Sequence, residues 1–351
     1  MQELLNYLKE AVERGASDIF IVSGQPVSFK RDGIIGPRDD ETVMPDSANR
    51  LVQSIYELAS RPTDRFLTTG DDDFSLSING LSRFRVSTYR QRGSMAAVIR
   101  VVRFDIPEPT SLTIPDEVMK IAQKPRGLVL ITGPAGGGKS TTLACVIDAI
   151  NQNRNAHIVT LEDPIEFLYR NKKSVISQRE VGTDTDSYLT ALRACLRQAP
   201  DVILLGEMRD YDTIRTAMTA AETGHLVLSS LHTVGAVNTI DRIIDVFPPN
   251  QQQQIRVQLS MVLQTVLSQQ LVPSVYGRLL PVFEIMHLTS SIRSLIRESK
   301  THQIDFVIQS SAQDGMCSMD NSLLELYKNG RITAETVLHY CRNAEMVTRK
   351  L

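Results

Sequence analysis

The pattern of apolar and polar positions changes character partway along the chain. In its N-terminal part, apolar residues alternate with polar ones over 74–78, and helical spacing governs 4–12 and 47–58. Alternation is typical of strands that bury one face, whereas spacing of three and four residues is typical of amphipathic helices. We therefore expect a small α+β domain over residues 1–103, with a first strand at 19–22.

Prolines interrupt the pattern next. Pro107, Pro109 and Pro115 lie between Phe104 and Asp116, and proline favours extended backbone and is excluded from helix interiors. We interpret 104–116 as an interdomain linker and as a hinge. An ordered loop on the surface of one domain is the alternative.

From residue 117 the apolar runs lose their alternation and are separated by helical patterns. This arrangement is typical of a parallel sheet buried on both faces. The pattern after Pro248 is mainly helical. We expect an α/β domain over 117–351 that ends in a helical region, with candidate strands at 128–132, 157–161, 202–206 and 226–230.

The sequence Gly-Pro-Ala-Gly-Gly-Gly-Lys-Ser fills every fixed position of a phosphate-binding loop and lies between an apolar strand and a predicted helix. In such a loop, backbone N–H groups and a helix N-terminus surround phosphate oxygens. Lys139 is expected to reach the β- and γ-phosphates of ATP, and the Ser140 hydroxyl to bind Mg²⁺. The expected cradle comprises Gly133, Pro134, Ala135, Gly136, Gly137, Gly138, Lys139, Ser140, Thr141 and Thr142.

Polar residues follow three later strands of this domain. Glu162 and Asp163 end the second candidate strand, Glu207 follows the third, and His225 and His232 bracket the fourth. Ligands of open parallel sheets bind beyond the carboxyl ends of the strands, so these ends are expected to converge on the loop. Taken singly, each residue has a structural alternative, as a helix cap or a core histidine.

Composition further limits the classes of protein to which the chain can belong. The chain has 351 residues, 42% of them hydrophobic, and 38 basic residues against 40 acidic ones. This balance does not favour nucleic-acid binding. We see neither a signal peptide nor an apolar stretch of about 18 residues, so we expect a cytoplasmic protein that meets membranes only through partners. The four cysteines form no zinc-binding pair.

The chain resembles the secretion and type IV pilus ATPases, and within them the PilT-type retraction motors of twitching motility. The resemblance is carried by the phosphate loop at 133–142, an acidic segment at 160–166, a Walker B strand at 201–210 and a histidine segment at 223–233. Residues 178–182 and 269–273 extend it over nearly the whole chain.

This resemblance implies a PAS-like N-terminal domain and a RecA-like P-loop ATPase domain, assembled as a hexameric ring. It implies that Glu162 activates or positions water, that Glu207 supports Mg²⁺ and that water, and that His232 senses the γ-phosphate. Asp163 and His225 join the nucleotide-binding residues. Arg83, Arg85 and Arg100 are expected to reach a nucleotide across a subunit interface; their alternative is pairing with acids on their own sheet.

The segment at 291–297, Ser-Ile-Arg-Ser-Leu-Ile-Arg, is similar to the Ala-Ile-Arg-Asn-Leu-Ile motif of retraction motors. The extra N-terminal region and the zinc cysteines of assembly ATPases are not seen. The resemblance thus implies pilus retraction on an inner-membrane platform protein, with a second retraction ATPase as a further partner. Ala135, Gly137 and Ala199 depart from the family pattern. In having alanine at position 199, the chain is similar to the accessory, PilU-type motors.

The alternatives left by the sequence are an accessory retraction ATPase, a pilus assembly ATPase, a nucleic-acid translocase, and a regulator that binds ATP but turns it over poorly.

Overall fold

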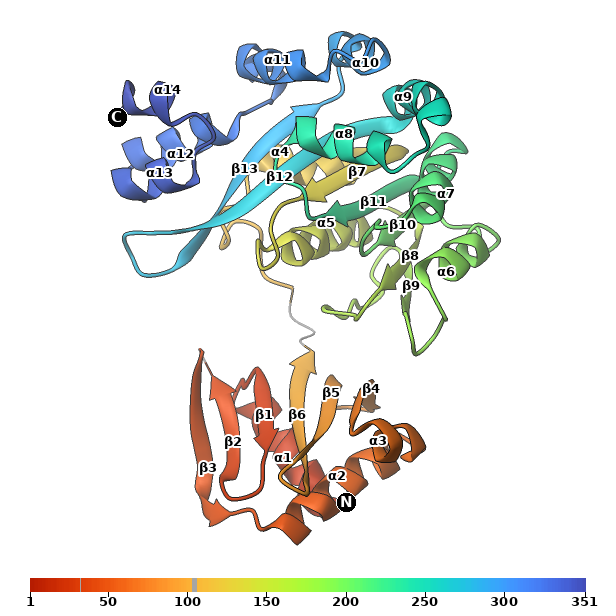
Figure 1. Cartoon of the computed structure of the whole chain (residues 1–351), viewed down its shortest axis with the longest axis vertical. Helices are drawn as coiled ribbons and strands as arrows, with labels where there is room; N and C mark the ends of the chain where they lie inside the picture. Colours follow the sequence, from red (N-terminus) through yellow and green to blue (C-terminus); the bar gives the residue numbers. More distant parts are fainter. Residues whose placement is uncertain (32, 103–105) are drawn as a thin grey trace. The chain divides into compact units, whose positions relative to one another are not determined.

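The computed structural model describes residues 1–31, 33–102 and 106–351. The chain divides into two compact units, one formed by Met1–Asp105 with Ile165–Leu168 and the other by Ile106–Pro164 with Tyr169–Leu351 (Figure 1). Among the described residues, no helix is both long enough and apolar enough to cross a bilayer.

The first unit is built on an antiparallel sheet of six strands in the order β3-β2-β1-β6-β5-β4. Its strands are β1 (Asp18–Ile21), β2 (Pro26–Arg31), β3 (Ile34–Thr42), β4 (Asp71–Ile78), β5 (Ser82–Gln91) and β6 (Ser94–Val102). Its helices are α1 (Gln2–Glu13), α2 (Pro45–Leu58) and α3 (Asp64–Thr69).

The alternating pattern places one side of this sheet in a core. Phe84 and Val86 of β5 pack with Leu8 of α1 and Ile55 of α2 in one apolar cluster. Residues between the buried positions of β5, such as Arg85, belong to the other face and are partly exposed. The expected α+β architecture is confirmed.

The second unit is built on a sheet of seven strands in the order β13-β12-β7-β11-β10-β8-β9. All neighbours in it are parallel except β12 and β13. Its strands are β7 (Gly127–Thr132), β8 (His157–Glu162), β9 (Val175–Glu180), β10 (Val202–Leu205), β11 (Leu226–Leu231), β12 (Leu263–Pro273) and β13 (Leu279–His287).

Helices cover both faces of this sheet, which explains the unbroken apolar runs in its strands. Val129 and Ile131 of β7 pack with α5 (Lys139–Asn153), whereas Leu128 and Leu130 belong to a second cluster on the other face. That second cluster includes residues of α6 (Tyr188–Cys195), α7 (Tyr211–Glu222), α8 (Ala236–Asp245), α9 (Pro249–Val262), α10 (Ser290–Arg297) and α11 (Ile304–Ser310).

Four further α-helices belong to this unit. They are α4 (Asp116–Met119), α12 (Met319–Lys328), α13 (Ala334–Tyr340) and α14 (Ala344–Thr348). The last three lie beside the long β12–β13 hairpin (Figure 1) and share an apolar cluster with it.

The expectation that the chain is mainly helical after Pro248 is wrong for residues 263–287. These residues form β12 and β13 with their connecting turn, and β12 pairs with β7 inside the sheet. Burial on both faces removes the alternation that marks a strand, so the periodicity of an apolar segment does not separate strand from helix here.

Residues 106–116, the described part of the expected linker and hinge, belong to the second unit. Ile114 is 6% exposed, and the Cys145 thiol donates to the Pro107 carbonyl at 3.3 Å. Leu112 contacts the same apolar cluster as α5. This part matches the alternative of an ordered surface loop; Phe104 and Asp105 lie outside the described residues.

Candidate nucleotide site

The phosphate loop connects β7 to α5 through a backbone that only glycine adopts readily. Gly133 has φ = 142°, and its N–H donates to the Leu231 carbonyl at 3.3 Å. A Cβ at this position would lie 2.0 Å from the Gln269 carbonyl oxygen. A side chain at residue 133 would therefore push the loop away from β12.

The Lys139 side chain folds back over this loop. It is 8% exposed, and its ammonium group donates to the carbonyl oxygens of Gly133 at 2.9 Å and Pro134 at 2.8 Å. A buried ammonium group needs such partners. The charge thus lies within the concavity where a phosphate is expected.

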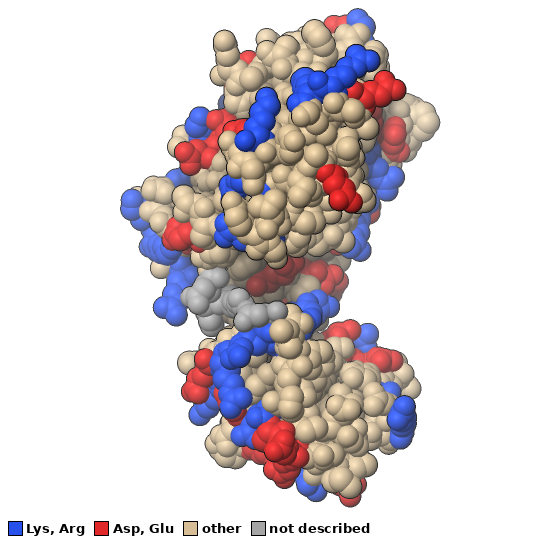
Figure 2. All heavy atoms as spheres, turned by 90° about the vertical axis from the view of Figure 1, so that its left-hand side faces the viewer, with Lys and Arg blue, Asp and Glu red and all other residues tan. Residues whose placement is uncertain are grey.

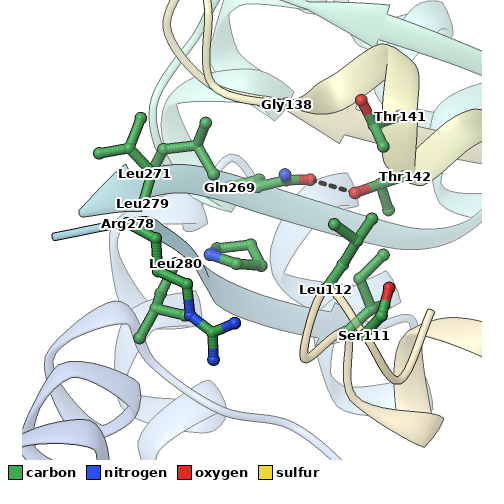
Figure 3. A pocket seen from close by; sticks show the side chains of 12 residues that line it. Ser111, Leu112, Gly138, Thr141, Thr142, Gln269, Leu271, Arg278, Leu279 and Leu280 are labelled. Carbon is green, nitrogen blue, oxygen red and sulfur yellow. Dashed lines mark hydrogen bonds between the residues drawn. The ribbon is translucent and has the colours of Figure 1, made fainter. Parts of the chain in front are cut away.

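Gln269 of β12 holds the other side of the loop, and the sequence reasoning missed it as an individual site residue. Its amide oxygen accepts a hydrogen bond from the Thr142 hydroxyl at 2.8 Å, and the residue is 2% exposed (Figure 3). An uncharged polar residue in an apolar segment was the available signal. The contact joins the start of α5 to β12.

A cavity of about 300 Å³ opens beside the start of α5 (Figure 3). Most of its wall is apolar, and Arg278, Thr141 and Ser111 add polar groups. The lining residues are Ser111, Leu112, Ile114, Gly138, Thr141, Thr142, Gln269, Leu271, Arg278, Leu279, Leu280 and Pro281.

Glu162 ends β8 and is nearly buried, with 8% of its surface exposed. One carboxylate oxygen, Oε1, accepts hydrogen bonds from the Thr160 hydroxyl at 2.6 Å and from the Gln178 amide at 3.4 Å. These contacts fix the orientation of the carboxylate. Asp163, the next residue, is exposed.

Glu207 and His232 meet at the ends of neighbouring strands. The imidazole Nε2 of His232 lies 3.4 Å from Glu207 Oε2, and the Arg209 guanidinium lies 2.7 Å from the same oxygen. Glu207 is largely buried, whereas His232 is half exposed. Because the Leu231 carbonyl bonds to Gly133, His232 follows β11 directly beside the phosphate loop.

Gly206 brings Glu162 and Glu207 close together. Its N–H donates to the Leu161 carbonyl at 2.8 Å, so the ends of β8 and β10 run side by side. A Cβ on Gly206 would lie 2.7 Å from the Tyr188 hydroxyl. Burial raises the pKa of Tyr188, as do the nearby Glu207, Asp163 and Glu162 carboxylates. No sequence signal pointed to Tyr188.

The structure does not bring His225 to this group. His225 precedes β11, and its Nδ1 lies 2.9 Å from the Ala220 carbonyl oxygen. Its own carbonyl accepts a hydrogen bond from Gly127, the first residue of β7. His225 therefore lies at the amino edge of the sheet, one strand length from His232.

The three arginines belong to the first unit. Arg85 and Arg100 are direct neighbours across β5 and β6, and Arg83 lies two residues before Arg85. The Arg100 guanidinium pairs with Asp18 at 3.0 Å. For Arg100, the structure thus shows the pairing with an acid on its own sheet that was the alternative to a role in trans.

A phosphate loop with two strand-end carboxylates and a histidine, on a sheet buried between helices, defines a P-loop ATPase. The sequence model of the type II/IV secretion system protein family matches residues 1–279. The chain belongs to this family.

Relatives from Pseudomonas aeruginosa cover nearly the whole chain. It is 40% identical to the type IV pilus retraction ATPase PilT over 95% of this chain and 96% of PilT. It is 37% identical to the type IV pilus ATPase PilU over 97% of this chain and 89% of PilU.

The fold is similar to a crystal structure of the pilus retraction motor PilT with bound ADP, with a TM-score of 0.91, 43% identity and 98% coverage of both chains. These likenesses confirm the expected resemblance to PilT-type ATPases and the RecA-like fold of the larger unit.

Proposed function

We propose that this chain hydrolyses ATP to power type IV pilus retraction and disassembly, and so twitching motility. The observation that supports this most is the convergence of the phosphate loop, Glu162 and the Glu207–His232 pair at one edge of the large sheet. The full-length similarity to a retraction ATPase and a retraction motor supports the choice of process.

The two carbonyl contacts of Lys139 suggest how the loop receives a nucleotide. Phosphate oxygens of ATP are stronger acceptors for an ammonium group than neutral carbonyls are, so ATP displaces Gly133 and Pro134 as its partners. Thr141 and the loop N–H groups surround the remaining phosphate oxygens. The cavity in Figure 3 takes the nucleoside between its apolar walls.

Glu162 positions and activates the attacking water. Hydrogen bonds from Thr160 and Gln178 to Oε1 orient the carboxylate that takes up a proton from this water. His232 senses the γ-phosphate, and its contact with Glu207 transmits the presence or loss of that group to the end of β10. Asp163 borders the same site.

The Ser140 hydroxyl and the Glu207 carboxylate are hard oxygen donors, which fits the preference of Mg²⁺. They would hold the ion with the phosphates, where its charge offsets that of the β- and γ-phosphates.

We assign residues 1–103 to a PAS-like domain and 117–351 to the ATPase domain of a homohexamer. In this ring, Arg83 and Arg85 reach the nucleotide of a neighbouring subunit, and Arg100 does so after leaving Asp18. The ring is cytoplasmic, lies against the inner face of the cell membrane and acts on a platform protein there.

α10 contains the segment at 291–297 that is similar to the motif of retraction motors, and this similarity supports retraction as the process. Ile292 and Ile296 are fully buried in the core, and the Arg293 guanidinium donates to carbonyls at the end of α9, at Ser260 and Met261. The helix therefore fixes the end of α9 and exposes Arg297 on its outer side.

The accessory, PilU-type role is the second candidate. Ala199, where many retraction motors have aspartate, adopts φ = 50°, a left-handed conformation that aspartate accepts more readily than alanine. A nucleic-acid translocase has less support, because basic and acidic side chains are interspersed on the face drawn in Figure 2.

Deleting the gene in the source organism tests the proposal. We expect more surface pili than in the wild type, together with lost twitching motility. Loss of pili would indicate an assembly ATPase, and unchanged pili and motility would contradict the proposal. Full hyperpiliation with partial motility would indicate the accessory role.

A further inference from the structure

The segment that follows His232 is anchored at the beginning of α8. The Gly235 N–H donates to the Ser268 hydroxyl at 2.8 Å, and the Ala236 N–H donates to Glu284 Oε1 at 2.9 Å. Ser268 and Glu284 are direct neighbours across β12 and β13. A carboxylate at a helix N-terminus also stabilises the helix dipole. Two adjacent strands thus set the position of the loop that carries His232.

Glu284 is itself held by the C-terminal helices. It is 2% exposed, and its Oε2 lies 3.2 Å from the guanidinium of Arg342, between α13 and α14. Asp305 lies 3.6 Å from the same guanidinium nitrogen. Burial raises the pKa of Glu284, and Arg342 opposes that rise. The ion pair therefore offsets part of the cost of burying this carboxylate, as the hydrogen bond from the Ala236 N–H also does.

Arg342 also covers Gly235. A Cβ on Gly235 would lie 1.3 Å from the Arg342 Nη2 atom, so the guanidinium occupies the space of a side chain there. The backbone of this segment is fixed in turn, because Asp320 of α12 accepts hydrogen bonds from the N–H groups of Arg342 at 2.7 Å and Asn343 at 3.1 Å. One side chain thus connects α12–α14 to the loop after His232.

We infer that Arg342 is a positioning residue for ATP hydrolysis, because it holds the His232 loop in register with the phosphate loop through Gly235 and Glu284. This inference rests on the proposed function of the site. It gives the C-terminal helices a direct mechanical connection to the residue that senses the γ-phosphate.

β12 provides separate anchors for the loop after His232 and for the phosphate loop. Ser268 holds the loop after His232, while its neighbour Gln269 holds the phosphate loop. Successive residues of a strand face opposite sides of the sheet, so the two loops have separate anchors on β12. Loss of Arg342 is therefore expected to disturb His232 without disturbing the groove that binds ADP.

The test compares Arg342→Met with Arg349→Met, a matched change at an exposed arginine of the same C-terminal segment. We expect Arg342→Met to lower kcat for ATP roughly tenfold, which is within the range for a coupling residue remote from the ligand. The dissociation constant for ADP, which lacks the γ-phosphate, should stay within about twofold. Arg349→Met should match the wild type in both measurements.

A double variant separates positioning from stability. Arg342→Met alone leaves an unpaired buried carboxylate and lowers the melting temperature. Adding Glu284→Gln removes that charge and keeps an acceptor for the Ala236 N–H. We expect the Glu284→Gln/Arg342→Met protein to regain thermal stability and stay slow. Recovery of full turnover along with stability would assign Arg342 a structural role only and overturn the inference.

A double-mutant cycle of Arg342 with His232 completes the test. If Arg342 acts through His232, His232→Ala/Arg342→Met should be no slower than His232→Ala alone. Multiplying effects, or wild-type turnover of Arg342→Met, would contradict the inference. Absence of ATP hydrolysis by the wild-type protein would instead contradict the proposed function.

Discussion

The two edges of the seven-stranded sheet carry the same kinds of residue with different partners. At the amino edge, His157 lies 2.9 Å from the Gln198 carbonyl oxygen, His225 lies against the Ala220 carbonyl, and His287 contacts Thr265 and Glu117. At the carboxyl edge, His232 is half exposed and faces the Glu207 carboxylate beside the phosphate loop.

The difference shows that surroundings, more than residue type, separate histidines held within the fold from one that faces the proposed nucleotide site. His157 and His225 contact carbonyls and hydroxyls of the same fold, and His287, which pairs with Glu117, is only 17% exposed. His232 is half exposed, and its carboxylate partner lies at the end of a strand beside the phosphate loop. Open parallel sheets place ligands at their carboxyl edge, so the contrast follows the direction of the strands.

The first prediction concerns the phosphate loop, where a large effect is expected. Lys139→Ala removes the ammonium group that we propose offsets phosphate charge, and turnover should fall by about 10²- to 10³-fold, the scale of a lost transition-state donor. ATP hydrolysis and circular dichroism of the purified protein measure this. Lys328→Ala, at an exposed lysine, is the control. Equal activity of the two variants would contradict a nucleotide site at the carboxyl edge.

The next prediction concerns whether one subunit supplies all the residues of the nucleotide site at the carboxyl edge. If Arg85 acts on a neighbour's nucleotide, Arg85→Ala should lower turnover by at least ~10²-fold, as for arginines supplied in trans. Mixing Arg85→Ala with Lys139→Ala subunits should then restore part of the activity, because some interfaces combine an intact loop with an intact arginine. Mixtures as inactive as either variant would argue against action in trans.

A comparison of two histidines on one strand tests the edges directly. His232→Ala should lower kcat about tenfold, the value of one charge-assisted hydrogen bond lost in the transition state. His225→Ala should leave kcat within about twofold, because His225 contacts a structural carbonyl. Steady-state kinetics decide this, and an equal loss in both variants would refute the assignment.

The smallest effect is expected for His287, at the amino edge. Burial lowers the pKa of this imidazole, so the unfolded chain takes up a proton before the folded one as the pH falls below about 6.5. Stability is therefore lost with falling pH, by at most about 1.4 kcal/mol per pH unit. His287→Gln should flatten this part of a urea-denaturation series, and an unchanged slope would contradict the cause.

The sequence predicted the carboxyl edge better than any other part of the molecule. The phosphate loop, Glu162 and Glu207 follow strands whose apolar runs are recognisable locally, and the parallel topology then brings their ends together. His225 shows the limit of this reasoning, because a histidine beside a strand does not reveal at which edge it lies until the direction of the strand is considered.

Contacts between segments that are distant in the sequence could not be predicted. β12 was missed because burial on both faces removes its periodicity. The hydrogen bond between Thr142 and Gln269 joins residues 127 positions apart, and the one between Ala236 and Glu284 joins residues 48 apart. Local spacing carries no information about such pairs.

The most direct test of the account is ATP hydrolysis by Glu162→Gln. This change keeps the size of the side chain but removes the carboxylate that we propose activates water. We predict that turnover falls by about 10²- to 10⁴-fold while ADP still binds, and that Glu222→Gln, at the exposed end of α7, hydrolyses ATP like the wild type. Wild-type turnover by Glu162→Gln would contradict a hydrolytic centre at the carboxyl edge.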